Sequence, residues 1–109
     1  MPNNQPQNPV ELIEIQANYP YSDPETVGVK DNWKTFCQVW AELQIGSGRE
    51  FFGAKQVNAE LSGLVKTLQY IKGVNSTMRV KCSRGTFEIT AAIDLRENDS
   101  VELHLRQVV

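Results

Sequence analysis

The sequence lacks several features that define common classes of protein. It has no run of about 20 consecutive apolar residues, the length that a membrane-spanning helix needs, so we expect no membrane partner. The chain of 109 residues has one histidine, two cysteines and a formal net charge of −2. These counts exclude a disulfide-rich miniprotein and a strongly basic nucleic-acid arm. Residues 1–9, MPNNQPQNP, have neither the basic start nor the apolar run of a targeting signal.

Proline is missing from most of the chain. All five prolines lie at or before Pro24. Because proline is poorly tolerated inside strands and helices, the proline-free part predicts regular structure. Residues 1–9 offer nothing to bury and are expected to be a disordered tail, with residues 10–109 as a single domain. Cys37 and Cys82 are expected to be free thiols in a reducing compartment, with a disulfide between them as the alternative.

The stretch 33–45, WKTFCQVWAELQI, has the clearest pattern in the chain. Its odd positions are mostly apolar and its even positions mostly polar. A period of two with one apolar face predicts a half-buried strand. Phe36 and Trp40 interrupt the polar face, and we expect them to cover a second small core or a neighbouring chain.

Other alternating runs predict strands at 10–16, 64–71, 78–82, 86–93 and 101–108. Ser83-Arg84-Gly85 predicts a tight hairpin, and a polar turn is expected at 96–100. Residues 17–32, with two prolines and a glycine, predict a long loop.

An insertion at 46–62 is predicted to contain a short helix. Ser47 and Glu50 match a capping box, and Phe51, Ala54 and Leu61 are spaced for one helical face. The whole pattern predicts a mainly β fold: a small β-barrel of about six antiparallel strands with one short inserted helix and a disordered N-terminal tail.

Few residues could support catalysis or hold a metal. His104 lies among the outward-facing polar residues of the last strand and is expected to be solvated. His104, Cys37 and Cys82 together supply three potential ligands, fewer than the four of a usual structural metal site. Gly46-Ser47-Gly48 resembles half of a phosphate-binding loop but lacks the rest of the motif. We therefore expect no enzyme, no metal and no cofactor.

Charge is distributed unevenly along the chain. No acidic residue lies between Leu61 and Phe87, whereas Glu88 to Glu102 is strongly acidic. The basic residues of the first segment are Lys66, Lys72, Arg79, Lys81 and Arg84. Three explanations stay open: two solvated faces, a nucleic-acid-binding barrel, or self-association in a head-to-tail ring with opposed charged faces.

Several motifs in the same order resemble the phage head–tail joining family, also called head closure or head–tail adaptor proteins. They are Trp40-Ala41, Gly48-Arg49-Glu50, the stretch containing Ala54, Gln56, Ala59 and Glu60, a strand that ends in Tyr70, and the runs MRV, FEI and ELHL. The likeness extends from Leu12 to Leu105. Three departures are Gln69, where the family usually has an arginine before the tyrosine, an uncharged leader, and the absence of the family's cysteine near Arg106-Gln107.

The resemblance implies a structural protein of a phage or prophage virion that assembles as a ring below the portal. Such a ring closes the DNA-filled head and connects it to the tail. The implied partners are further copies of the chain, which is a monomer in isolation, the portal or adaptor protein, and the tail or tail-completion protein. DNA would pass only through the channel, and the protein would move from the host cytoplasm into the virion. The alternative is a small nucleic-acid-binding barrel that uses Lys66, Arg79, Lys81 and Arg84.

The resemblance and the sequence pattern together indicate where assembly contacts are expected. The expected contact residues are Arg49, Glu50, Phe51, Phe52, Gln56 and Trp40, with the loop 17–32 beside them. Phe51 and Phe52 are adjacent and cannot both face one core from a helix, so at least one is expected to contact a partner or another segment. For Glu50, a role as the carboxylate of the capping box is as well supported by the sequence as an assembly contact.

Overall fold

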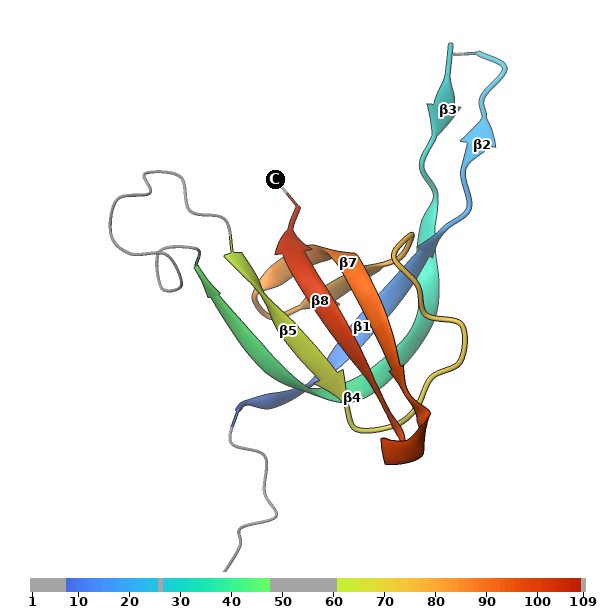
Figure 1. Cartoon of the computed structure of the whole chain (residues 1–109). Coiled ribbons are helices and arrows are strands. Elements are labelled where there is room, and N and C mark those ends of the chain that lie inside the picture. The colour runs from blue at the N-terminus through green and yellow to red at the C-terminus, as the bar shows by residue number, and fades with distance from the viewer. Residues whose placement is uncertain (1–7, 26, 48–60, 109) are drawn as a thin grey trace, which may run out of the picture.

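The computed structural model describes residues 8–25, 27–47 and 61–108. Its elements in chain order are β1 (Val10–Asn18), β2 (Tyr21–Ser22), β3 (Val29–Lys30), β4 (Trp33–Ser47), β5 (Leu61–Thr67), β6 (Arg79–Cys82), β7 (Gly85–Leu95), the 3-10 turn η1 (Arg96–Asn98) and β8 (Ser100–Gln107). Figure 1 shows the long strands curled around a common centre and β2 and β3 projecting from one end.

Six of the strands close into an antiparallel barrel in the order β1-β4-β5-β8-β7-β6, with β6 returning to β1. This confirms the predicted small barrel of about six antiparallel strands. Closure leaves none of these six strands with an open edge along its whole length. The predicted helix falls on residues 48–60 and the N-terminal tail largely on residues 1–7, which lie outside the described residues.

The alternation in β4 places its apolar face inside the barrel, as predicted. Val39, Ala41 and Leu43 are buried, whereas Phe36 and Trp40 are exposed on the outer face. Inward-facing residues of the other barrel strands complete the core, in which Phe87 is the largest fully buried side chain. Each Å² of apolar surface removed from water stabilises the fold by about 25 cal/mol, so this interior is the main source of stability.

Residues 17–32 are more regular than the long loop that the prolines predict. Ala17 and Asn18 extend β1, and β2 pairs with β3 through Tyr21 opposite Lys30 and Ser22 opposite Val29. Pro20 and Pro24 lie just outside the paired residues, where a missing N–H costs no ladder hydrogen bond. The long loop is therefore replaced by a short hairpin that continues the β1–β4 ladder outward (Figure 1).

The strand predicted at 64–71 ends at Thr67 instead. The backbone carbonyl of Thr67 accepts a hydrogen bond from the Ser100 hydroxyl at 2.7 Å. The side-chain hydroxyl of Thr67 donates to the backbone carbonyl of Gln69, also at 2.7 Å. These side-chain bonds take the place of further ladder bonds and turn the chain away from β8. Residues 68–78 then form a connection to β6 that packs Ile71 and Val74 against the core.

Two turns follow the predicted positions. Ser83 and Arg84 form the two-residue connection between β6 and β7, and Gly85 has a φ of 122°, a conformation that glycine adopts without strain. The polar segment after β7 forms η1 and ends at Asp99, whose φ is 53°.

Candidate functional site

An exposed apolar group, which we call the outer strip, lies on the outside of the barrel: Leu12 on β1, Trp40 on β4, and Leu68 directly after β5. Leu12 lies opposite Trp40 in the β1–β4 ladder, and the backbone N–H of Leu68 donates to the carbonyl of Trp40 at 2.8 Å. The three side chains are 45%, 56% and 49% exposed. Apolar side chains gathered on neighbouring strands of an outer face are typical of a contact surface.

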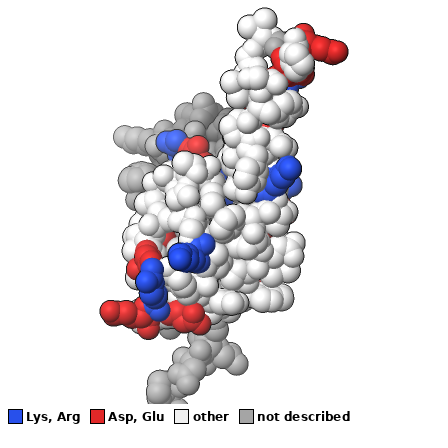
Figure 2. Space-filling view, turned by 90° about the vertical axis from the view of Figure 1, so that its right-hand side faces the viewer, with Lys and Arg blue, Asp and Glu red and all other residues white. Residues whose placement is uncertain are grey.

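The second exposed apolar surface is the projecting hairpin, which we call the arm: residues 19–25 and 27–32. Its exposed apolar side chains are Tyr19, Tyr21, Val27 and Val29. Figure 2 shows the arm extending beyond the body of the molecule, with acidic side chains at its tip and mostly uncharged surface below it. A two-stranded ladder of this size has little stability of its own in water.

The base of the arm is held by a set of hydrogen bonds. The backbone N–H of Tyr19 donates to the carbonyl of Asn32 at 2.8 Å. The Asn18 side chain accepts the N–H of Asn32 at 2.8 Å and donates to Asp31 at 3.1 Å. The Lys34 ammonium lies 6.0 Å from the centre of the Tyr19 ring. These contacts fix the direction in which the arm leaves the barrel.

A polar network joins β6, β1 and β4 beneath the arm. The Arg79 guanidinium lies 4.1 Å from the Trp33 ring centre, and its Nε donates to the Gln16 side chain at 2.7 Å. Glu14 accepts the Thr35 hydroxyl at 2.6 Å and the Gln16 amide at 2.8 Å. These two hydrogen bonds, the one from Thr35 first, lower the pKa of Glu14 below its ordinary value.

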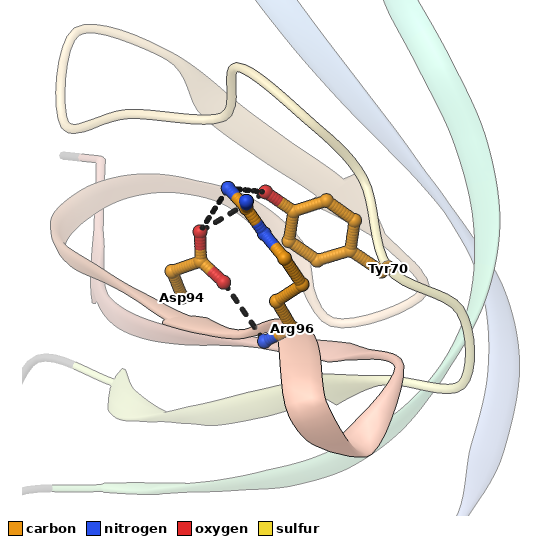
Figure 3. Close-up of polar contacts among 3 residues, drawn as sticks. All are labelled: Tyr70, Asp94 and Arg96. Atoms are coloured by element: carbon orange, nitrogen blue, oxygen red, sulfur yellow. Dashed lines mark hydrogen bonds and ion pairs between the residues drawn. The ribbon is translucent and has the colours of Figure 1, made fainter.

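At the opposite end of the barrel, Tyr70, Asp94 and Arg96 form a cluster (Figure 3). The Tyr70 hydroxyl donates to Asp94 at 3.0 Å, and Arg96 contacts both the Tyr70 oxygen at 3.1 Å and Asp94 at 3.3 Å. Desolvation raises the pKa of Asp94, but the hydrogen bonds from Tyr70 and the Arg96 backbone outweigh it and leave the pKa lowered. The cluster ties the 68–78 connection to the end of β7.

The basic residues of the 61–87 segment do not form one surface. Lys66 lies on β5, whereas Arg79 and Lys81 lie on β6, and the strand order places β5 and β6 on opposite sides of the barrel. Arg84 lies in the β6–β7 turn, beside a hollow of about 430 Å³ that Glu11 also lines. A continuous nucleic-acid groove would need these cations on adjacent strands.

The acidic residues of the 88–102 segment are largely engaged in local contacts. Glu88 pairs with Arg106 across β7 and β8, Asp94 with Arg96, and Glu102 with His104 at 3.0 Å. Asp99 accepts the backbone N–H of Tyr70 at 3.1 Å. The two oppositely charged segments of the sequence therefore do not become two uniform faces.

The described residues contain no cluster of three or more potential metal ligands. Cys37 and Cys82 are free thiols, and burial raises the pKa of each. In the part of the chain that the structure describes, no helix is long and apolar enough to cross a membrane.

Of the predicted contact residues, only Trp40 lies within the described part of the chain. Arg49, Glu50, Phe51, Phe52 and Gln56 lie outside it. Leu12, Leu68 and the apolar residues of the arm were not among the predicted contacts. The sequence does contain a signal for Leu12, because the 10–16 run has apolar residues at both odd and even positions. No such signal exists for Leu68, which comes to lie beside Trp40 only through the β4–β5 pairing.

The fold and these surfaces define the class of protein: a small closed β-barrel with an apolar arm and an apolar outer strip, suited to contact with other proteins. Residues 9–108 match the phage head completion protein family, and the chain belongs to that family. It is a structural component of a phage head, as the resemblance in its motifs predicted.

Two solved structures share the fold. A chain in the virion of a native gene transfer agent particle has a TM-score of 0.65 and 22% identity, covering 91% of this chain and 94% of that one. Protein SF1141 of Shigella flexneri 2a has a TM-score of 0.59 and 21% identity, covering 88% of this chain and 89% of its own. No curated protein matches the chain.

Proposed function

We propose that this protein joins the phage head to the tail. Copies of the chain assemble as a ring below the portal, close the DNA-filled head and present a surface to the tail. The observation that carries the proposal is membership of the phage head completion family across residues 9–108. The exposed arm and outer strip support it, because a barrel that joins other proteins needs apolar contact surfaces besides its core.

The partners follow from this position in the particle. One side of the ring meets the portal or an adaptor protein, and the other meets the tail or a tail-completion protein. Neighbouring copies contact one another, and the free protein is a monomer until it docks. DNA passes through the ring without base-specific contacts. The protein works in the host cytoplasm during assembly and then stays in the virion.

The contacts are assigned to two parts of the chain. The first comprises Arg49, Glu50, Phe51, Phe52 and Gln56, between β4 and β5. The second is Trp40 with its neighbours on the outer strip, where 56% of the tryptophan side chain is exposed. A large aromatic side chain left in water on a sheet face supports a role in contact, because buried aromatic residues contribute strongly to interfaces.

Deletion and complementation test this function. In cells that produce the phage, deletion of the gene is expected to give heads without tails, many of them empty because nothing closes the DNA exit, visible by electron microscopy. The full chain supplied from a plasmid should restore tailed particles. A normal yield of DNA-filled, tailed particles from the deletion would contradict the proposal.

Variants then test the assigned contacts. Phe51→Ser, Phe52→Ser and Trp40→Ser should each reduce the fraction of tailed particles, whereas Thr90→Ser, on the opposite strand β7, should not. A gel shift with increasing salt addresses the nucleic-acid alternative, since a phosphate-binding protein loses affinity steeply with salt. Salt-sensitive DNA binding together with normal tailed particles in the deletion would favour that alternative.

A further inference from the structure

The arm continues from a part of the β1–β4 ladder that has no third strand beside it, which we call the ribbon. β1 pairs with β6 only from Glu14 to Gln16, and β4 pairs with β5 only from Ala41 onward. Past these points β1 and β4 pair with each other alone, as far as Asn18 opposite Trp33. Among the described strands, the ribbon therefore has no neighbouring ladder to fix its direction relative to the barrel.

A β-bulge lies where the ribbon leaves the barrel. Ile15 pairs with Cys37 and Gln16 with Thr35, so Phe36 is an extra residue on β4. A bulge interrupts the ladder and bends the strand that contains it. Because the arm lies beyond this point, a small change of angle at the bulge would move the whole arm (Figure 1). The direction of the arm is therefore set at the bulge, unless a further contact ties the ribbon to the barrel.

A side chain from a third strand supplies such a contact. Arg79, the first residue of β6, lies opposite Gln16, and its guanidinium lies 4.1 Å from the centre of the Trp33 ring. Its Nε donates to the Gln16 side chain at 2.7 Å, and Gln16 is only 8% exposed. The hydrogen bonds of Asn18 join the ribbon and the arm to each other. The Arg79 contact instead joins the ribbon to a strand of the barrel.

The side chains around Arg79 orient its guanidinium. Glu88, which lies opposite Arg79 in the β6–β7 ladder, pairs with Arg106 on β8. The amide nitrogen of Gln16 donates to Glu14 at 2.8 Å, and the amide oxygen of Gln16 accepts the Arg79 Nε. The guanidinium is therefore held by a hydrogen bond at its edge and by the indole ring at its face. Such a stacked arginine attracts the ring electrostatically as well as by contact.

We propose that Arg79 is a brace that holds the arm in one direction relative to the barrel. By stacking on Trp33 it immobilises the ribbon beyond the bulge, so the free chain presents Tyr21 and Val29 in a fixed place. A preorganised arm loses less conformational entropy when it docks on another surface, which strengthens binding. This inference goes beyond the proposed function, because it concerns the free chain and holds whichever protein the arm meets.

NMR relaxation of the backbone amides of the full chain tests the brace on the fast timescale. Arg79→Met keeps an apolar stem and removes the guanidinium, whereas Trp33→Leu removes the ring. Each variant is expected to lower the order parameters of the arm amides and to leave those of β5 and β8 unchanged. Arg96→Met is the matched control, because the Arg96 guanidinium lies 5.3 Å from the centre of the Tyr70 ring at the opposite end of the barrel.

A timed trypsin digest measures slower opening, because the ribbon must fray before the arm can enter the protease. Cleavage after Lys30 should be about fivefold faster in Arg79→Met and in Trp33→Leu, the factor that corresponds to about 1 kcal/mol. Cleavage after Lys66, within β5, reports global unfolding and should rise less. The double variant should be no faster than either single variant, because both changes remove the same contact. Arg79→Lys, which keeps the cation and loses the planar group, should be intermediate.

Arm order parameters and cleavage that both stay unchanged in Arg79→Met would overturn the inference. Equal loosening of the arm in Arg96→Met, or additive effects in the double variant, would also overturn it. So would cleavage after Lys66 that rises as much as cleavage after Lys30, because the whole barrel would then have lost stability. These measurements use the free chain, so their failure is distinct from a failure of the joining function, which the tailed-particle assay detects.

Discussion

Leu12 and Trp40 lie directly opposite each other on the outside of the barrel, on two strands whose inner faces form the core. Both side chains are about half exposed, although each belongs to a type that is usually buried. The pair therefore adds little to the interior of a single chain. Exposed apolar side chains paired in this way are typical of a contact surface.

The first prediction separates stability from assembly at this pair. Trp40→Ser is expected to lower the free energy of unfolding by about 1 kcal/mol, the size of one aromatic cross-strand contact, while the fraction of tailed particles falls sharply. Urea denaturation and complementation measure the two quantities. Leu103→Ala in the core is the comparison and should cost about 2–5 kcal/mol. An equal loss of stability in both variants would contradict a contact role for Trp40.

The second prediction concerns the arm base. Asn18→Ala removes the bonds to Asn32 and Asp31, at 2.8 and 3.1 Å, and should cost about 1 kcal/mol while loosening the arm. We expect faster trypsin cleavage after Lys30 in a timed digest. Asn98→Ala, in the exposed turn η1, is the control and should leave this cleavage unchanged.

The third prediction concerns pH and Glu14. Its pKa is lowered in the folded protein by the hydrogen bonds from Thr35 and Gln16, so folding favours the ionised form. This contribution is fully present above the ordinary glutamate pKa and is lost as the pH falls through the lowered folded value. Urea titrations at a series of pH values below about 5 should show a shallower decline for Glu14→Gln than for the unchanged protein. Identical slopes would contradict the prediction.

The fourth prediction concerns Tyr70 and Asp94. Because the Tyr70 hydroxyl donates to Asp94 and helps to lower its pKa, Tyr70→Phe should raise that pKa towards its ordinary value. An NMR titration of the Asp94 side-chain carboxyl carbon measures the change. Thr77→Val alters a hydroxyl elsewhere in the same connection and should leave the Asp94 pKa where it is.

The fifth prediction concerns Gly63, where β5 passes close to β4. A Cβ at this position would lie 2.3 Å from the carbonyl oxygen of Gln44 and 2.8 Å from the Cα of Ile45. Since both are backbone atoms, Gly63→Ala should cost about 1–3 kcal/mol, as overpacking does. Ser62→Ala, on the neighbouring residue, is the control for thermal unfolding. Similar melting temperatures for the two variants would contradict the prediction, because they would mean that β4 and β5 can move apart to accept the added methyl group at little cost.

Some features of the site were accessible from the sequence and others were not. Trp40 was predicted to lie on the outer face, covering a second small core or a neighbouring chain, because it interrupts the polar face of a strongly alternating strand; the structure leaves it 56% exposed there. Leu68 could not be placed, because the sequence pattern of a strand continues through 64–71, whereas the hydrogen bonds of Thr67 with Ser100 and with Gln69 end the strand. Arg96 could not be matched to Tyr70, since 25 residues separate them and no local pattern relates the two.

The sequence by itself determined the mainly β class, the inward face of β4, the tight Ser83–Arg84 turn and the family. These depend on local periodicity, turn chemistry and ordered motifs, all of which are properties of neighbouring residues. The tertiary structure alone decided the strand order, the separation of Lys66 from Lys81, and the meeting of Leu12 with Trp40 and Leu68. Pairing between distant segments sets those relationships, because the same alternating strands are compatible with several registers until closure of the barrel selects one.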